Sequence, residues 1–537
     1  MRKAKADELW RDTFPRVPKT SMNTPQLQAM TFTDRVDDFL KKRRRWIAAA
    51  CCLLGALRIL IFAAGFPLFN PVDEASHYEM VYEYSRGFQP GARLLKTDPQ
   101  MARIFSLYGT DEYLVAKDIL ERFHRDVPLP ALAQDLREYY YPRRMTFWLR
   151  QSNIETQSPP AYYLLAGGWY RLGEFVGLRD WAIAYWTRFL NAILYAAFIW
   201  VSYLFVERTY SEKAFLSVGT PLLLAVFPQD VFLGVNRDVL SPLLAALILL
   251  LLFRALAKDS GGHRELLAAG VLAGIAFLTE VSNFVLFGVL LAVLLARSRR
   301  AEKAGNQGHE QLVYAGSLLA AGALPLAWMA RNRIVMGDFT AAHEKTFYLG
   351  WIVKNWNEMW RHPIFTPSGL WYFLRELTGS FWRGEIAWAH GALRNGAAEF
   401  FYLYSTLALL ACFVLYFLRS RTDDRALQRW SGWTAIYVFS ASVVFMAAIS
   451  LPYDFQECVY PSRAAPYFVS GRIIIGALLP FVVMYLSGLE YLLRPLGKYF
   501  HPIFPLLLIC AGILWAEATI AEVAFRSHFN FYSLVRM

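Results

Sequence analysis

The chain has 537 residues, of which 56% are hydrophobic and only 18% are charged. This composition excludes a soluble globular enzyme and is typical of a polytopic membrane protein. The formal net charge of +12 does not indicate nucleic-acid binding, because lysine and arginine gather in the cytoplasmic loops of membrane proteins and set their orientation. The cysteines predict no disulfide framework, since all but Cys458 lie in apolar runs.

The N-terminal segment, residues 1–45, is polar and ends in the basic run Lys41–Arg45, directly before the first apolar stretch. The positive-inside rule therefore predicts a cytoplasmic N-terminus. No short apolar segment lies near Met1, so a signal peptide is not expected. The first span is predicted at Trp46–Phe66. Arg58 interrupts it, and would either snorkel to an interface or contact a phosphate.

The motif NPVDEASHYEM follows this span, at Asn70–Met80. It places Asp73, Glu74 and His77 at the expected membrane surface, where charge is costly without a partner or a function. A carboxylate there could act as a general base that takes a proton from a substrate hydroxyl. Alternatively, Asp73 and Glu74 could simply offset the dipole of a helix N-terminus. The same three side chains could also bind a divalent cation.

A long polar loop, residues 67–158, is predicted on the outside. Amphipathic patterns at Glu79–Arg86, Met101–Arg122 and Leu129–Arg150 predict juxtamembrane helices that lie on the bilayer. The apolar segment that follows, 159–177, is short and flanked by proline and glycine, so we expect it to be re-entrant or interfacial.

Further apolar runs predict the remaining spans. They lie at about 183–206, 214–232, 239–257, 264–279, 281–297, 311–330, 399–419, 430–450, 471–491 and 503–523. The total is about 11 spans with the C-terminus outside, or about 12 to 13 if short segments also cross. The resulting division is a cytoplasmic segment 1–45, a transmembrane module 46–330 with the outer loop 67–158, an outer loop with amphipathic helices 331–398, and C-terminal helices 399–537.

On this topology several polar motifs share the outer side. They are GVNRD at Gly234–Asp238, RNRIVMGD at Arg331–Asp338, SFWRGE at Ser380–Glu385 and SGR at Ser470–Arg472. Asp238 could be a helix N-terminal charge or a site residue. Arg331, Arg333 and Arg472 could snorkel, or could hold a phosphate bidentately. Glu280, between two apolar runs, is expected to be a turn residue.

No nucleotide-binding loop, zinc-protease motif, CxxC pair or GxSxG elbow occurs in the chain, so ATP-driven transport and zinc hydrolysis lack support. A carboxylate base and arginines at an outer membrane surface suit transfer from a lipid phosphate, whose developing charge the arginines would stabilise. This chemistry fits sugar transfer from a polyprenyl-phosphate donor.

These residues resemble the GT-C superfamily of integral-membrane glycosyltransferases, which includes protein O-mannosyltransferases and the aminoarabinose transferase of lipid A. In that superfamily an acidic residue after the first helix is the catalytic base, the position that Asp73 and Glu74 occupy here. The segment PPAYY, Pro159–Tyr163, is similar to the superfamily's PPLYY, and Asp238 is similar to its second acidic site.

The order of the motifs is closest to an uncharacterised bacterial branch of GT-C-like proteins. The pattern PPDEPxHF, LPQ-NxD, RN-x-GD, SFW and GRY-x-P resembles strings that run from about residue 70 to 480 here. This chain departs from the pattern in having Val72 for the second proline, Ile473 for the tyrosine after Arg472, and Arg237 for a small polar residue.

The resemblance implies an all-α GT-C fold and an inverting glycosyltransferase of the bacterial inner membrane, with its active site on the periplasmic face. It implies a polyprenyl-phosphate sugar donor, a glycan, lipid or protein acceptor, and no nucleic-acid partner. The expected catalytic residues are Asp73 as the base, with Glu74 and His77 orienting it. The expected substrate-binding residues are Asn236, Asp238, Tyr162, Tyr163, Arg331, Arg333, Trp382 and Arg472. No cofactor is certain, and a divalent cation is the one candidate. The alternatives are a flippase for lipid-linked glycans and a non-catalytic scaffold.

Overall fold

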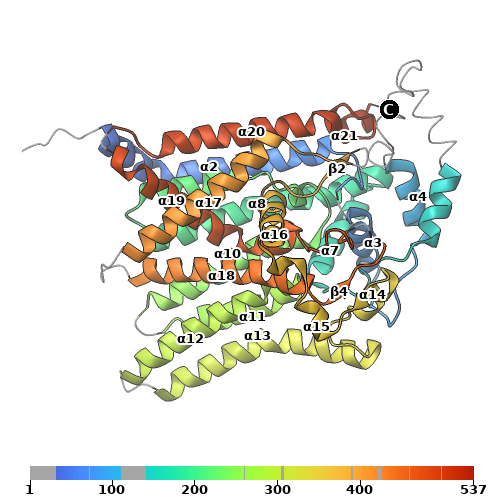
Figure 1. The fold of residues 1–537 in the computed structure, drawn as a ribbon, viewed down its shortest axis with the longest axis horizontal. Coiled ribbons are helices and arrows are strands. Elements are labelled where there is room, and N and C mark those ends of the chain that lie inside the picture. The colour runs from blue at the N-terminus through green and yellow to red at the C-terminus, as the bar shows by residue number, and fades with distance from the viewer. Residues whose placement is uncertain are drawn as a thin grey trace, which may run out of the picture.

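The computed structural model describes residues 32–71, 73–109, 141–258, 261–303, 307–388, 391–419, 426–458, 460–497 and 499–536. Long helices run side by side along the horizontal axis of Figure 1, and the strands form only two short two-stranded sheets. The protein is therefore an all-α polytopic membrane protein, as predicted from its sequence.

Nine helices in the described part of the chain are long and apolar enough to cross a membrane. They are α2 (Phe32–Gly65), α8 (Asp180–Thr209), α10 (Ser241–Leu256), α12 (Val285–Lys303), α13 (Gln307–Met336), α17 (Gly396–Arg419), α18 (Ala426–Ser450), α19 (Leu478–Leu493) and α20 (Ile503–Phe525). The 3-10 turns η2 (Arg237–Leu240), η3 (Val281–Phe284) and η6 (Gly471–Ala477) extend α10, α12 and α19 at their N-terminal ends.

Two of the predicted spans form shorter helices. Residues 214–232 contain α9 (Ala214–Ala225), which has 12 residues, and 264–279 contain α11 (His263–Phe277), which has 15. Every predicted apolar run thus lies on a helix, and the predicted count of about 11 depends on whether these two cross.

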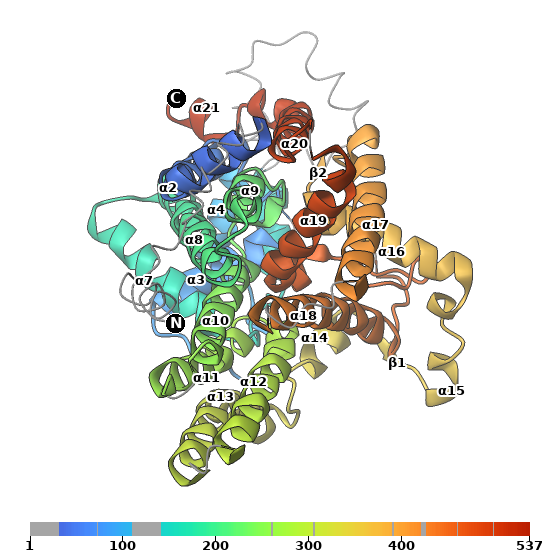
Figure 2. The ribbon, with the colours of Figure 1, turned by 90° about the vertical axis from the view of Figure 1, so that its left-hand side faces the viewer.

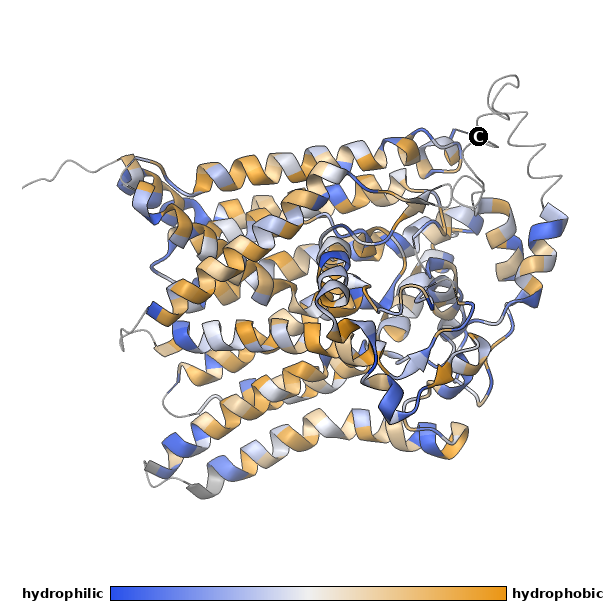
Figure 3. Cartoon of the chain, in the orientation of Figure 1, coloured by the Kyte–Doolittle hydropathy of each residue, from blue (hydrophilic) through white to orange (hydrophobic). Residues whose placement is uncertain are grey.

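The remaining elements are short. They are α3 (Glu74–Ser85), α4 (Pro99–Tyr108), α7 (Ala161–Phe175), η1 (Asp230–Leu233), α14 (His343–Tyr348), β1 (Ile352–Val353), α15 (Trp356–Met359), η4 (Pro363–Phe365), α16 (Pro367–Arg383), β2 (Ala387–Trp388), β3 (Gly391–Ala392), β4 (Tyr453–Asp454), η7 (Arg494–Leu496) and α21 (Phe531–Leu534). Helices α3, α4, α7 and α14 gather at the right-hand end of Figure 1, where Figure 3 shows many hydrophilic residues.

The predicted juxtamembrane helices are partly described. Glu79–Arg86 corresponds to α3, and the start of Met101–Arg122 corresponds to α4, whereas residues 110–140 lie outside the described part. The described end of the third pattern, 141–150, is helical. Helix α7 has 15 residues and so a length of ~22 Å, which is too short for a ~30 Å hydrocarbon core and supports a re-entrant or interfacial segment at 159–177.

The packing brings distant segments together at the polar end. Helix α2 packs against α8 and α9, α3 packs against α7, and α16 packs against η6. Strand β1 pairs antiparallel with β4, which ties the loop after α13 to the segment before η6. Viewed from one end, α17, α18 and α19 lie on one side of the molecule and α11, α12 and α13 extend away from it (Figure 2).

The ends of the described chain lie at opposite ends of the bundle. Helix α2 begins at the left-hand end of Figure 1, and the C-terminus lies at the right-hand end. An odd number of crossings produces this arrangement.

Arg58 of α2 does not reach an interface. It is buried and forms a bidentate ion pair with Glu517 of α20, with 2.7 Å between Nε and Oε2. Neither of the two roles expected for Arg58 is therefore seen, because its partner is a carboxylate of the neighbouring span.

Candidate functional site

Asp73 occupies the N-cap position of α3 but does not cap it. Its backbone is left-handed, with φ 61° and ψ 5°, and its side chain accepts no hydrogen bond from the first turn. Few residues other than glycine, asparagine and aspartate adopt this conformation. The carboxylate is therefore turned away from the helix N-terminus and remains available to another partner.

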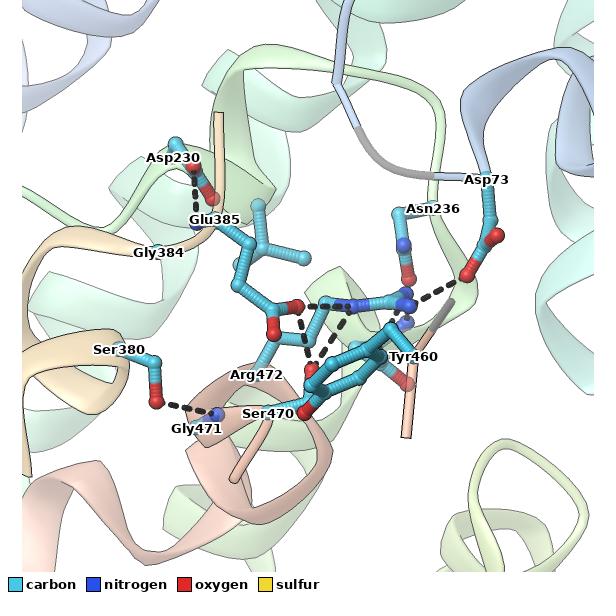
Figure 4. A network of polar contacts seen from close by, with 12 residues as sticks. Asp73, Asp230, Asn236, Ser380, Gly384, Glu385, Tyr460, Ser470, Gly471 and Arg472 are labelled. Atoms are coloured by element: carbon cyan, nitrogen blue, oxygen red, sulfur yellow. Dashed lines mark hydrogen bonds and ion pairs between the residues drawn. The ribbon is translucent and has the colours of Figure 1, made fainter. Parts of the chain in front are cut away.

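That partner is Arg472, at the start of η6. Its Nη2 lies 2.5 Å from Oδ2 of Asp73, its Nη1 lies 3.4 Å from Oδ2 of Asp238, and its Nε lies 3.2 Å from Oε2 of Glu385. Figure 4 shows the Arg472 guanidinium between the side chains of Asp73 and Glu385. We call Arg472, Asp73, Asp238 and Glu385 the Arg472 centre.

The Arg472 centre joins four segments that are far apart in the sequence. Asp73 follows α2, and Asp238 lies in η2, just before α10. Glu385 follows α16, and Arg472 lies in η6, just before α19. Three carboxylates face one guanidinium, so the centre carries an excess of negative charge. The Asp73 side chain is 30% exposed and the Arg472 side chain is 14% exposed, which leaves Asp73 the more accessible partner.

The side chain of Asn236 holds the backbone of Asp238 in place. It is the N-cap of η2, and its Oδ1 accepts a hydrogen bond of 2.9 Å from the backbone N–H of Asp238. Because the amide of Asn236 satisfies the helix end, the carboxylate of Asp238 is free to face Arg472. The reading of Asp238 as a simple N-terminal charge does not account for this contact.

Glu385 is held in place by Asp230. Oδ2 of Asp230 accepts hydrogen bonds from the backbone N–H groups of Glu385, at 2.6 Å, and Ile386, at 2.7 Å. Burial raises the pKa of Asp230 to about 7, and the nearby Glu385 adds to this, while the two N–H donors act in the opposite direction. Ser470 donates a hydrogen bond of 2.5 Å to Oε2 of Glu385, on the side facing Arg472.

Gly384 makes this contact between the Asp230 carboxylate and the backbone of Glu385 possible. Its backbone has φ 89° and ψ −153°, a region that is essentially restricted to glycine. A Cβ atom at this position would lie 1.8 Å from Oδ1 of Asp230. The glycine of SFWRGE therefore lets the Asp230 carboxylate approach the backbone that carries Glu385.

We expect Gly384→Ala to destabilise the protein and to displace Glu385 from Arg472. The strained backbone alone costs about 1–3 kcal/mol, and the clash with Asp230 adds to this. The measurement is the unfolding midpoint of the purified protein. Gly396→Ala is the control, because its Cβ would meet no atom within 4 Å. Equal unfolding midpoints for Gly384→Ala and Gly396→Ala would contradict the proposed role of Gly384.

Glu74 is buried and fully engaged in contacts within the protein. Its carboxylate accepts hydrogen bonds from Arg188 Nε at 2.6 Å and Arg188 Nη2 at 2.5 Å. It also accepts from the backbone N–H groups of Phe69, at 2.7 Å, and Val235, at 2.9 Å. Glu74 thus ties α3 to α8 and to the turn before η2, and of the two adjacent acids only Asp73 faces Arg472.

His77 lies on the buried face of α3, against Tyr163 of α7. Its Nδ1 lies 2.8 Å from the Tyr163 hydroxyl, and its Nε2 is buried with no partner among the described residues. The pKa of His77 is lowered to about 3, chiefly by burial; Glu155 and Asp73 oppose this shift, whereas Arg237 and Arg472 add to it. His77 is therefore a neutral imidazole at neutral pH.

We expect His77 to make the fold sensitive to acid. Because its pKa is below the ordinary value of 6.5, its contribution to stability is complete above pH 6.5 and is lost as the pH falls towards 3. The difference is on the order of 2 kcal/mol at pH 5. His77→Gln should therefore lose less stability than the unmutated protein between pH 8 and pH 5, as measured by denaturant unfolding. Parallel losses in both proteins would contradict a neutral buried His77.

The two tyrosines of PPAYY are both buried. Tyr163 stacks between His77 and Tyr84, at centroid distances of 6.0 and 5.6 Å. The hydroxyl of Tyr162 is buried beside the backbone of Asn236. Tyr163 therefore supports the face of α3 that carries His77.

Three other predicted site residues make their contacts away from Arg472. Arg331 bonds to the carbonyl of Pro90 and lies 5.2 Å from the ring of Trp328, while Arg333 bonds to the carbonyl of Gly337. Trp382 is fully buried. Its ring stacks on Tyr402 at 4.9 Å and on Phe227 at 4.8 Å, and its Nε1 donates to Thr406.

The three side chains considered for a divalent cation do not form a ligand set. No group of three or more His, Cys, Asp or Glu that could hold a metal ion occurs among the residues that the structure describes. Glu74 turns towards Arg188, His77 towards Tyr163 and Asp73 towards Arg472.

The sequence predicted no role for four residues of this region. They are Asp230, Glu385, Arg188 and Glu155. Glu385 ends the motif SFWRGE, and Asp230 lies just before the motif GVNRD, so their places in or beside these motifs were the available signal. Arg188 and Glu155 stand in no motif, and only the fold brings them to α3 and η2.

The family model described as "Predicted membrane protein (DUF2142)" matches residues 53–457, which is more than half of the chain. The match includes Asp73, Asp238 and Glu385 and ends before Arg472. None of the curated proteins compared with the chain matches it.

A solved structure of the archaeal oligosaccharyltransferase AglB from Archaeoglobus fulgidus, in complex with an inhibitory peptide and a dolichol-phosphate, is similar to the chain. The TM-score is 0.39 and the sequence identity is 15%. The match covers 90% of this chain and 56% of that chain, so this chain spans little more than half of its length. A likeness of this size carries no information about activity.

Proposed function

The chain belongs to the DUF2142 family of membrane proteins, and from this premise we propose that it is a GT-C-type glycosyltransferase of the bacterial inner membrane. It moves a sugar from a polyprenyl-phosphate-linked donor to an envelope acceptor on the periplasmic face. The observation that carries the proposal is the Arg472 centre. Asp73, Asp238, Glu385 and Arg472 come from four of the motifs that the sequence predicted on one face, and they meet at a single guanidinium.

In the proposed reaction Asp73 is the general base. Its carboxylate is partly exposed and does not cap its helix, so it can take the proton of an acceptor hydroxyl. The acceptor oxygen forms a bond to the anomeric carbon, the bond from that carbon to the phosphate oxygen breaks, and the polyprenyl phosphate leaves with the electron pair. Direct displacement inverts the anomeric configuration.

Arg472 is the proposed group that stabilises the leaving phosphate. In the resting state all of its contacts go to carboxylates and to Ser470, so a phosphate has to replace one of them. The contact with Asp238 is the longest of the three ion pairs, at 3.4 Å, and is therefore the one expected to yield.

One observation favours the second candidate, a flippase for lipid-linked glycans. A charged pair inside the bundle, Arg58–Glu517, is of the kind that marks transport pathways. Arg58 stands seven residues before Gly65, the end of α2, and hence ~10 Å from that end. The pair therefore lies close to the middle of the predicted span Trp46–Phe66. Because each charge is satisfied by the other, it serves as a contact between α2 and α20, and transfer remains the better-supported function.

A transfer assay tests the proposal. The purified protein in lipid vesicles would be given radiolabelled polyprenyl-phosphate sugars and a crude envelope fraction as acceptor. Protein-dependent movement of label to the acceptor is expected. Label that stays on the lipid but changes leaflet would support the flippase instead, and label that does neither would contradict both.

A further inference from the structure

A cavity of about 600 Å³ lies between α3, α4, α7 and the start of α8, away from the Arg472 centre. Asp73 is the N-cap of α3 and Arg86 is its C-cap, so the 12 residues of this helix put the cavity ~18 Å from Asp73. A cavity of this size is large enough for a small molecule. Its charged lining residues are Arg86, Arg103, Glu174, Arg179 and Asp180.

Two of the arginines form ion pairs in the wall of the cavity. Arg86 pairs with Glu174 through Nη2, and Nη1 of Arg103 lies 3.2 Å from Oδ1 of Asp180. Each pair engages one nitrogen, whereas a guanidinium carries N–H donors on all three of its nitrogens. The side chains of Arg86 and Arg103 are 44% and 48% exposed, so a ligand that enters from solvent can reach their other N–H groups.

Arg179 has no carboxylate partner among the residues that the structure describes. Its Nη1 donates to the backbone carbonyl of Leu178, at 3.2 Å, and its side chain is exposed. Arg179 is also the N-cap of α8, and no side chain caps this end of the helix. Because α8 has 30 residues, its dipole adds partial positive charge at the same place.

The charges of the cavity favour an anion. Three arginines face two carboxylates, and each carboxylate is already paired with an arginine other than Arg179. The cavity therefore has an excess of one positive charge. Arginine forms two parallel hydrogen bonds to carboxylate or phosphate groups. Of these two, phosphate has more oxygens and so offers acceptors to all three guanidinium groups.

The surroundings of the cavity indicate a position at the membrane surface. Helix α8 is long and apolar enough to cross a membrane, and its first residues line the cavity. Beside the cavity, one face of α7 exposes Leu164, Leu172, Phe175 and Val176, a pattern typical of a helix in contact with lipid. Lipid head groups lie at this level, and soluble molecules reach it from the aqueous side.

We propose that this cavity is a binding site for a phosphate group, which Arg86, Arg103 and Arg179 hold. The phosphate belongs either to a lipid head group or to a soluble molecule. A ligand held in this way links the end of α3 to α4 and to the start of α8. The site is separate from the Arg472 centre, and binding to it does not depend on the proposed sugar transfer.

The test measures binding to the full-length protein in an uncharged maltoside detergent, without donor or acceptor. Thermal unfolding would be followed during titration with inorganic phosphate, with dihexanoyl-phosphatidylglycerol, and with dihexanoylglycerol, which has the same chains but no phosphate. Ionic strength is kept constant, so that screening is equal throughout. The variants are Arg179→Gln and the control Arg361→Gln, which removes another exposed arginine of the described chain.

We expect a phosphate-bearing probe to stabilise the unmutated protein and Arg361→Gln, and to bind Arg179→Gln about 10-fold more weakly, as loss of one charged donor group predicts. Dihexanoylglycerol should not distinguish the variants. If Arg179→Gln does not fold, Arg179→Lys replaces it, because it keeps the charge but loses the bidentate geometry.

The two phosphate probes identify the source of the ligand. Weaker binding of both probes to Arg179→Gln supports a site for soluble phosphates, whereas weaker binding of phosphatidylglycerol alone supports a site for a lipid head group. Equal affinities of the unmutated protein, Arg361→Gln and Arg179→Gln for both probes would overturn the phosphate site. A failure of sugar transfer would count against the proposed function alone, because no turnover enters this measurement.

Discussion

Replacing Asp73 with asparagine is expected to lower sugar transfer by about 10²- to 10⁴-fold, the usual contribution of a general base. The substitution is nearly isosteric and removes only the proton acceptor. Because the Asp73 side chain is 30% exposed and does not cap α3, the protein should still fold. The measurement is the rate of label transfer from the polyprenyl-phosphate donor, beside the unfolding midpoint of the same preparation.

Two further variants separate a base from a structural contact of Arg472. Asp454→Asn removes another carboxylate that is paired with an arginine, Arg463, and this variant should transfer label at the normal rate. Asp73→Ala should regain part of its activity with added formate, which can take over proton transfer but cannot rebuild a side-chain contact. Full turnover by Asp73→Asn would exclude Asp73 as the base.

Replacing Arg188 with methionine is expected to destabilise the protein by about 3–5 kcal/mol, because it leaves the buried charge of Glu74 without a partner. Arg188 is completely buried, and it also donates to the carbonyls of Ala63, Phe66 and Pro67, at 2.9, 2.6 and 2.7 Å. These carbonyls end α2 and begin the turn that leads to Asp73. Denaturant unfolding measures the loss.

The double variant Arg188→Met/Glu74→Gln tests the cause. If the stranded charge dominates, the double variant should be more stable than the sum of the single losses predicts. Arg526→Met is the control, since it breaks an exposed pair with Glu522 that is worth about 0–1 kcal/mol. If Arg188→Met loses no more stability than Arg526→Met, the Arg188–Glu74 pair does not hold α3 in place.

The sequence was most informative about the helices. Apolar runs of about 20 residues can hardly be anything but membrane helices, because the bilayer forces each span to satisfy its own backbone hydrogen bonds. All ten runs predicted after the first lie on helices. The crossing status of 214–232 and 264–279 was harder to predict, since α9 and α11 have only 12 and 15 residues and are held by their neighbours as much as by lipid.

The candidate site was partly predictable. Asp73, Asp238 and Arg472 were singled out because a charged residue next to an apolar span is unusual enough to mark a position, and the structure brings these three together. What each charge contacts depends on packing between segments that the sequence does not link. For this reason Glu385 and Asp230 received no role.

Aromatic and arginine side chains were harder to interpret from the sequence. Trp382 was predicted to bind substrate. In the structure its ring stacks on Tyr402 and Phe227, because a large ring in an apolar setting buries equally well against protein. Arg331 and Arg333 stand in a polar motif like Arg472 does, yet they contact carbonyls of their own surroundings. The local sequence pattern does not distinguish an arginine that pairs with distant carboxylates from one that bonds to nearby carbonyls.

The distance along the chain between Asp73 and Arg472, 399 residues, also sets when the site can form during biosynthesis. Helices enter the membrane in order, so Asp73, Asp238 and Glu385 are synthesised long before their shared cation. Until η6 emerges, these carboxylates have no Arg472 and repel one another. The charge balance of the Arg472 centre is therefore completed only after almost all of the helices have been synthesised.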